Sequence, residues 1–257
     1  MQTNHEGPFD GVRMNKQPIE KATRSNGVHL DTIGVFYTVQ GEGPFSGMPA
    51  IFIRLAGCNL RCPFCDTDYT AGREARAVDG LVDQVVQLAR PGVVKLVVIT
   101  GGEPFRQQIG NLIAKLIDAG FAVQVESNGT LPPNDLTVWG LEWKVQPSMP
   151  LHGAYIVCSP KTGKVHEKVV SRACCFKYVL DADHIDEDDG LPTTALGHTA
   201  NPRVARPPSW WDRPVYVQPA DHADSMENRR NVKVAVASAM NHGYTLQLQL
   251  HKHVGLE

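Results

Sequence analysis

Residues 50–65 read Ala50-Ile-Phe-Ile-Arg-Leu-Ala-Gly-Cys58-Asn-Leu-Arg-Cys62-Pro-Phe-Cys65. The apolar beginning of this stretch is rich in β-forming residues, so we expect a short strand that leads directly into a loop with three thiols. A structural zinc site takes four ligands, and an ordinary four-cysteine iron–sulfur cluster takes four thiolates. Three thiolates can hold three irons of a cubane and leave the fourth iron with an open coordination site, which is where chemistry takes place.

Two other interpretations of the cysteines stay open at this point. One is a zinc site with a distant histidine as its fourth ligand, since the chain has 10 His. The other is a disulfide, which is disfavoured because a chain of 257 residues with only 6 Cys and a polar start does not read as a secreted scaffold. We therefore expect a reducing, cytoplasmic setting. No stretch of the sequence has the apolar length of a membrane span.

The overall composition favours a small-molecule ligand over a nucleic acid. The formal net charge is only −2, which gives no electrostatic footprint for nucleic acid. Residues 1–29 are polar and lack periodicity, and we expect a flexible N-terminal extension outside the fold. Residues 30–257 would then form a single domain.

Strand-like apolar runs alternate with segments of helical spacing from residue 50 onward. Such alternation predicts parallel βα units with right-handed crossovers. About six units fall short of a closed eightfold barrel, so we predict an α/β fold, a partial βα barrel with inserted loops and its chemistry at the carboxyl edge of the sheet. The expected strands are 50–55, 93–100, 121–126, 155–157, 176–180, 215–218 and 244–250, the expected helices are 81–88, 106–119 and 225–242, and the expected loops or lids are 131–151 and 182–213.

The motif Thr100-Gly-Gly-Glu-Pro104 follows one of the expected strands. It can be a plain turn, or its glycines can let the backbone approach a ligand while Glu103 accepts a hydrogen bond from an ammonium group. The cysteine loop has spacings of three and then two residues, with an aromatic residue before the last cysteine. Together the two motifs resemble those of the radical S-adenosylmethionine (SAM) superfamily, in which the open iron chelates SAM.

Further motifs narrow the resemblance. In order they are Val39-Gln-Gly-Glu-Gly43, Ile51-Phe-Ile-Arg-Leu55, Cys65-Asp-Thr67, Ser159-Pro-Lys161, Gln218-Pro219 and His251-Lys252. In this combination the chain resembles the 7-carboxy-7-deazaguanine synthases of queuosine biosynthesis, and the resemblance covers residues 30–257.

The resemblance implies three cofactors. Cys58, Cys62 and Cys65 would hold a 4Fe–4S cluster that completes its coordination with SAM. Thr67 matches a magnesium ligand, and magnesium commonly takes few protein oxygens and keeps waters and substrate oxygens. The residues that match SAM contacts are Phe64, Asp66, Gly102, Glu103, Ser159, Pro160, Lys161 and Gln218.

The same resemblance implies a substrate site. Arg54 suits this role because a guanidinium can bind a carboxylate through two hydrogen bonds. Glu257 matches a terminal carboxylate that approaches the substrate. The residues that match substrate-binding positions are Val39, Gln40, Gly41, Arg54, Thr100 and Glu257.

The implied activity is that of a carbon–nitrogen lyase. It converts 6-carboxy-5,6,7,8-tetrahydropterin to 7-carboxy-7-deazaguanine with release of ammonia, and SAM acts catalytically through a 5′-deoxyadenosyl radical. The family also implies a flavodoxin or similar electron donor and a homodimer. The net charge and the lack of a long apolar stretch argue against nucleic acid and membrane as partners.

Two alternatives stay open from the residues alone. A glycyl-radical-activating enzyme is also a radical SAM protein, but such enzymes usually carry additional ferredoxin-type cysteines. The other cysteines here are Cys158, Cys174 and Cys175, and their places in expected strands favour packing. A zinc-binding interaction module is the second alternative.

Overall fold

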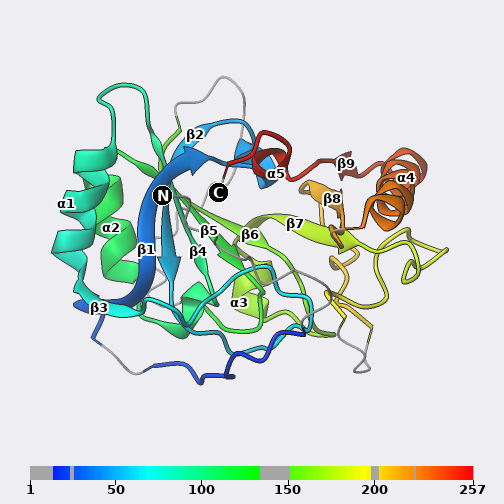
Figure 1. The fold of residues 1–257 in the computed structure, drawn as a ribbon, viewed down its shortest axis with the longest axis horizontal. Coiled ribbons are helices and arrows are strands. Elements are labelled where there is room, and N and C mark those ends of the chain that lie inside the picture. Colours follow the sequence, from blue (N-terminus) through cyan, green and yellow to red (C-terminus); the bar gives the residue numbers. More distant parts are fainter. Residues whose placement is uncertain (1–13, 24–25, 134–150, 198–202, 223, 257) are drawn as a thin grey trace, which may run out of the picture.

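One mixed sheet organises the part of the chain that the computed structural model describes, residues 14–23, 26–133, 151–197, 203–222 and 224–256. Within this part the sheet has nine strands in the order β3-β1-β2-β4-β5-β6-β7-β8-β9 (Figure 1). Neighbours from β2 to β9 pair in parallel. Strand β1 pairs antiparallel with both β2 and β3. The parallel βα units of the predicted α/β fold are therefore present.

Strands and helices alternate only in part, since β2 and β3 follow one another with no helix between them. The strands are β1 (His29–Val39), β2 (Pro49–Leu55), β3 (Glu74–Ala77), β4 (Leu96–Gly101), β5 (Ala122–Ser127), β6 (Ala154–Cys158), β7 (Ala173–Leu180), β8 (Val215–Pro219) and β9 (Thr245–Leu246). The helices are α1 (Val78–Leu88), α2 (Gly110–Asp118), α3 (Glu167–Val170), α4 (Ser225–His242) and α5 (Leu250–His253), with 3-10 turns η1 (Gly43–Phe45) and η2 (Pro104–Arg106).

The two faces of the parallel strands carry different side chains, because successive residues of a strand point to opposite faces. On β2, Ile51, Ile53 and Leu55 belong to the larger core cluster, which also contains the buried faces of α1 and α2. Phe52 packs against a second cluster on the other face. Arg54 shares the face of Phe52, and this side of the sheet is called the inner face below. Figure 1 shows α1 and α2 side by side near one end of the sheet and α4 at the other end.

Helix α4 has the bounds that the sequence predicts, because both of its ends are set by local chemistry. The Asp224 side chain accepts hydrogen bonds from the amides of Met226 and Glu227 at 2.8 and 2.9 Å, which caps the first turn. Gly243 follows the last turn with φ 74, the left-handed conformation that ends many helices. The strands expected before residue 244 are also present, and their ends differ from the predicted ends by a few residues.

The helix expected over 106–119 begins later than predicted, at Gly110. The Glu103 side chain accepts a hydrogen bond from the Phe105 amide at 3.0 Å and caps η2 instead. The chain leaves η2 through Gln107 in an extended conformation before α2 starts. A side-chain cap thus replaces the first helical turn.

The strand expected over 244–250 is wrong beyond Leu246. The side-chain oxygen of Gln247 accepts a hydrogen bond from the Gly43 amide at 2.7 Å. The Leu250 amide then donates to the Gly41 carbonyl at 3.2 Å, and α5 starts there. The closing segment therefore turns back towards the end of β1.

Strands β1 and β3 were not among the expected elements. They pair antiparallel from Thr32↔Glu74 to His29↔Ala77, so the edge of the sheet before β2 is antiparallel. The parallel units begin only with β2 and β4.

The N-terminal segment differs from the expected extension outside the fold. Residues 14–23 lie along the cysteine loop, and Ile19 forms an isolated parallel bridge with Cys58. Residues 1–13 and 24–25 are outside the described residues. A single domain that begins at residue 30 stays a prediction.

Both expected long loops contain residues outside the described part, at 134–150 and 198–202. The described residues of the second loop include Leu196 with φ 50, the one non-glycine residue in the described ranges that adopts a positive φ.

Among the helices of the described ranges, none combines the length and apolar character needed to cross a membrane.

Candidate active site at the carboxyl edge of the sheet

The cysteine loop starts directly after β2. Its three cysteines are free thiols, with Cys62 buried and Cys58 and Cys65 half-buried. Burial, together with the neighbouring Glu103 and the two other thiols, raises the pKa of Cys58 to about 12. Burial, helped by Asp66 and the Cys62 thiol, also raises the pKa of Cys65 to about 12. The pKa of each of these two thiols is thus raised by another thiol, and thiols lose their protons when they bind a metal.

The GGEP segment packs tightly against the start of the cysteine loop. A Cβ on Gly102 would lie 1.9 Å from the Gly57 carbonyl oxygen, so only glycine fits there. The Glu103 amide donates to the same carbonyl at 3.0 Å. The two motifs therefore meet, and the close approach that the glycines permit is to the cysteine loop.

Glu103 joins the carboxyl ends of β4 and β5. Its buried carboxylate accepts hydrogen bonds from the Ser127 hydroxyl at 2.9 Å and the Asn128 amide at 2.8 Å. Burial raises the pKa of Glu103 to about 7, although these hydrogen bonds and Lys161 oppose the shift. Three donors of the chain, the amides of Phe105 and Asn128 and the Ser127 hydroxyl, thus bind this carboxylate.

Phe64 and Asp66 lie on either side of Cys65. The Phe64 amide donates to the Leu196 carbonyl at 3.0 Å, so the long loop after β7 reaches the cysteine loop. The Asp66 carboxylate lies 3.7 Å from the Lys252 ammonium of α5. The Thr67 hydroxyl donates to Asp66 at 3.3 Å. The chain's last helix is thus brought next to the predicted SAM and magnesium residues.

Ser159, Pro160 and Lys161 follow β6 at the same edge. The Lys161 ammonium donates to the Ser159 carbonyl at 3.0 Å. Burial lowers the pKa of Lys161, and the Cys62 thiol opposes this shift. Gln218 lies buried near the end of β8 and accepts a hydrogen bond from Gln247 at 2.6 Å.

Three of the predicted substrate residues lie on strands, Val39 on β1, Arg54 on β2 and Thr100 on β4. Arg54 stands opposite Thr100 in the β2–β4 register, and its guanidinium lies 5.0 Å from the centre of the Phe36 ring. Val39 ends β1. The Gln40 side chain donates to Glu126 at 3.2 Å on the inner face.

Gly41 lies against α5, where a Cβ would meet the His251 ring. In the described ranges most predicted site residues lie at or after the carboxyl ends of β2, β4, β6 and β8. Val39 instead pairs with Pro49 at the start of β2, and Gln40 and Gly41 lie on the loop that follows. Glu257 lies outside the described residues.

Comparison with known proteins finds a matching family and similar sequences. The radical SAM superfamily model matches residues 52–181. A 7-carboxy-7-deazaguanine synthase of Rhodospirillum rubrum is 44% identical over 224 residues, which cover 85% of this chain and 88% of that protein. The enzyme of the same name from Rickettsia prowazekii is 35% identical over 93% of this chain and 94% of its own length.

The chain belongs to the 7-carboxy-7-deazaguanine synthase family.

The fold of this chain is similar to that of a solved structure. The crystal structure of QueE from Escherichia coli has a TM-score of 0.62 over 89% of this chain and 100% of that chain, at 22% identity. This likeness concerns the fold, and it confirms the partial βα barrel of the radical SAM type.

The residues present fit the cofactors of a radical SAM enzyme. Three free thiols with no disulfide among them supply the donors that three irons of a cubane require. Cys158, Cys174 and Cys175 are buried in β6 and β7, as packing residues are. This disfavours a second, ferredoxin-type cluster and with it the glycyl-radical-activating alternative.

The inner face also holds a buried charged group that was not predicted from the sequence. The Lys177 ammonium of β7 lies 2.9 Å from the Glu126 carboxylate and also pairs with Glu42. Burial would lower the pKa of Lys177, but Glu126 and Glu42 raise it overall. A lysine in the middle of the apolar run Ala173–Leu180 was the available signal, since an isolated charge in a buried strand needs a partner.

Proposed function

We propose that this chain converts 6-carboxy-5,6,7,8-tetrahydropterin to 7-carboxy-7-deazaguanine with release of ammonia. The observation that carries the proposal is the position of Arg54. It lies on the inner face of β2, opposite Thr100 and four residues before the first cysteine of the loop. A guanidinium at this place suits a substrate with a carboxylate, because the pair can form two parallel hydrogen bonds.

The protein's own residues would orient the pterin. Arg54 would bind the carboxylate, and the Gln40 amide with the Glu42–Lys177–Glu126 group would face the polar ring edge. When bound, the cluster and SAM supply one-electron cleavage of SAM and removal of a hydrogen atom from the pterin. The closely packed inner face would keep water away from this chemistry.

The contacts to the cofactors are part of the same proposal. Cys58, Cys62 and Cys65 would hold the cluster, and Thr67 would be the protein ligand of magnesium. The SAM residues would be Phe64, Asp66, Gly102, Glu103, Ser159, Pro160, Lys161 and Gln218, and the remaining substrate residues Val39, Gly41, Thr100 and Glu257.

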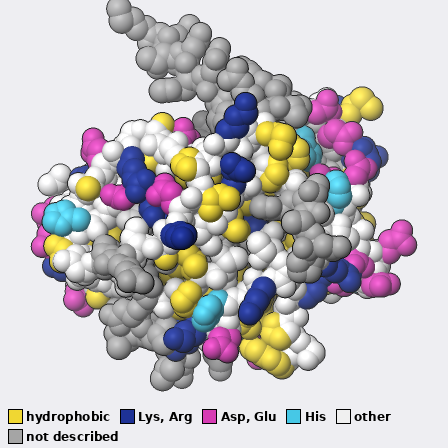
Figure 2. Space-filling view, turned by 90° about the horizontal axis from the view of Figure 1, so that it is seen from below, with side chains coloured by type: hydrophobic (Ala, Val, Ile, Leu, Met, Phe, Trp, Pro, Cys, Tyr) yellow, Lys and Arg dark blue, Asp and Glu magenta, His cyan; other side chains and the backbone are white. Residues whose placement is uncertain are grey.

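The electron donor in this proposal is an acidic carrier such as a flavodoxin. Figure 2 shows the face at the lower edge of Figure 1, where Lys and Arg side chains are spread over the middle and most Asp and Glu lie towards the rim. A face of this kind attracts an acidic partner. The proposal also includes a homodimer, which rests on the family resemblance, and a cytoplasmic location, which rests on the few cysteines and the polar start of the sequence.

The test is anaerobic incubation of reconstituted protein with SAM, a reductant, magnesium and the carboxytetrahydropterin. We expect 7-carboxy-7-deazaguanine and ammonia. Arg54→Lys should raise KM about tenfold, because the lysine keeps the charge and loses one of two charged hydrogen bonds. Arg61→Lys, on the exposed part of the cysteine loop, is the matched control and should leave KM unchanged. No product from protein with an intact cluster would refute the substrate.

A further inference from the structure

The segment of residues 14–23 lies against the cysteine loop and is called the strap below. The Glu20 amide donates to the Cys58 carbonyl at 2.7 Å, and the Asn15 amide donates to the Pro63 carbonyl at 2.8 Å. The Asn15 side chain donates to the Cys62 carbonyl at 3.1 Å. The strap therefore binds the carbonyls of two of the three cysteines.

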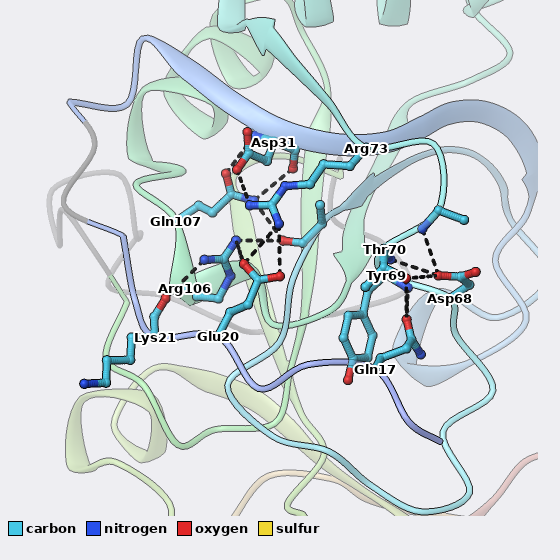
Figure 3. Close-up of polar contacts among 12 residues, drawn as sticks. Gln17, Glu20, Lys21, Asp31, Asp68, Tyr69, Thr70, Arg73, Arg106 and Gln107 are labelled. Carbon is cyan, nitrogen blue, oxygen red and sulfur yellow. Dashed lines mark hydrogen bonds and ion pairs between the residues drawn. The ribbon is translucent and has the colours of Figure 1, made fainter. Parts of the chain in front are cut away.

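Gln17 extends this contact to the residues after Cys65. Its side-chain nitrogen donates to the Thr67 carbonyl at 3.0 Å, and its side-chain oxygen accepts from the Tyr69 amide at 2.7 Å. Figure 3 shows Gln17 directly beside Tyr69. Both ends of the loop and its middle are thus held by one short segment.

The loop needs such partners because it has almost no regular secondary structure. Within it, the Cys65 amide donates to the Cys62 carbonyl at 3.2 Å, and the Gly57 amide donates to the Tyr69 carbonyl at 2.9 Å. Carbonyl groups without a partner are costly when buried. The strap supplies the donors to the carbonyls of Cys58 and Pro63.

The second half of the strap joins the loop to the segment after the GGEP motif. The Glu20 carboxylate lies 3.2 Å from the Arg106 guanidinium and 3.0 Å from the Arg73 guanidinium, and Figure 3 shows it between the two. Arg106 is buried and also donates to the Lys21 carbonyl at 3.1 Å. A Cβ on Gly57 would lie 2.5 Å from this guanidinium, so Arg106 packs directly against the residue before Cys58.

The exposure of successive strap residues matches these contacts. Asn15, Gln17 and Glu20 are half-buried and bind the loop or Arg106, whereas Lys16 between the first two is exposed. The strap thus presents its amides and one carboxylate inwards.

We propose that the strap is a positioning element for the cluster: Asn15, Gln17 and Glu20 hold the cysteine loop in the shape that binds three irons and slow the loss of the cluster. Among the described residues, the strap binds mainly the backbone of the loop and makes no hydrogen bond to a cysteine thiol. It therefore acts on the shape of the loop and on access to the cluster. The proposal rests on the cluster site above, and its test needs neither SAM nor pterin.

The test compares full-length wild type with the double variant Asn15→Ala/Gln17→Ala and the control Lys16→Ala. Each protein is reconstituted anaerobically and mixed with a strong iron chelator, and the decay of the cluster's visible absorbance is followed. We expect the double variant to lose its cluster at least about tenfold faster, because two side chains that close the loop are removed. Lys16→Ala should decay at the wild-type rate. Thermal melting of the apo-proteins is recorded in parallel.

Equal rates of cluster decay in the double variant and the wild type would overturn the proposal. This holds even if the apo-protein of the double variant melts at a lower temperature than the wild-type apo-protein. Equal acceleration in Lys16→Ala would overturn it as well. Where the double variant does not take up iron, the single variant Asn15→Asp decides. It keeps an acceptor for the Gln17 amide, which lies 2.9 Å from Asn15, and loses the donor to the Cys62 carbonyl, so faster decay supports the proposal and a wild-type rate contradicts it.

Discussion

The His251 ring occupies the space in front of Gly41: a Cβ built on Gly41 would lie 1.9 Å from Nδ1 of His251. The contact joins α5 near the C-terminus to the loop after β1. The Leu250 amide strengthens it by donating to the Gly41 carbonyl at 3.2 Å. The C-terminal helix is therefore docked on the loop that carries the predicted substrate residues Gln40 and Gly41.

Gly41→Ala should undock α5. The added methyl group would push the His251 ring away, and we expect amide hydrogen exchange in residues 247–254 to become about tenfold faster. Gly34→Ala is the matched control, because a Cβ there would meet nothing within 4 Å. Exchange rates that agree among Gly41→Ala, Gly34→Ala and the wild type would contradict the account of this contact.

Acidification should weaken the same contact. Burial lowers the pKa of His251 below its ordinary value of 6.5, although Glu42 opposes the shift. The unfolded chain therefore takes up this proton before the folded chain does. The contact of neutral His251 therefore contributes fully to the free energy of unfolding above pH 6.5. This contribution is lost as the pH falls through the lowered pKa of His251 in the folded protein. Urea denaturation from about pH 7.5 to about pH 5.5 measures it, and His251→Gln should show a smaller decrease. An identical decrease in both proteins would exclude His251 as the cause.

Lys177→Met should strongly destabilise the protein. The change leaves Glu42 and Glu126 without their shared cation on the inner face. Removing one partner of a buried ion pair costs about 3–5 kcal/mol, and urea denaturation of the apo-protein measures this. Lys168→Met replaces an exposed lysine of α3 and serves as the control. A loss below about 1 kcal/mol for Lys177→Met, the range of surface pairs, would show that the group is not a buried ion pair.

The sequence predicted those parts of the fold whose cause is local. Helix α4 is correct at both ends because Asp224 and Gly243 act on residues next to them. The cysteine loop and the GGEP motif were recognisable for the same reason, since each motif is contiguous. Their contact through Gly57 and Gly102 follows from the parallel pairing of β2 and β4.

Features that depend on distant partners were not predictable. Asn15 and Gln17 look like linker residues until the loop about fifty positions later supplies carbonyls for them. Gln247 belongs to a period-two pattern typical of a strand, yet its side chain binds the Gly43 amide, 204 residues away in sequence. Lys177 pairs with carboxylates on two other elements. In each case a polar side chain is satisfied by a tertiary contact that no local pattern contains.

We propose that the loop of Cys58, Cys62 and Cys65 holds a cluster whose open iron takes SAM. Electron paramagnetic resonance of the anaerobically reconstituted and reduced protein, recorded before and after addition of SAM, tests it most directly. The account predicts about four irons per chain, a cluster signal that changes when SAM is added, and loss of that signal in Cys62→Ser. Zinc in place of iron, or a cluster signal that SAM leaves unchanged, would contradict it.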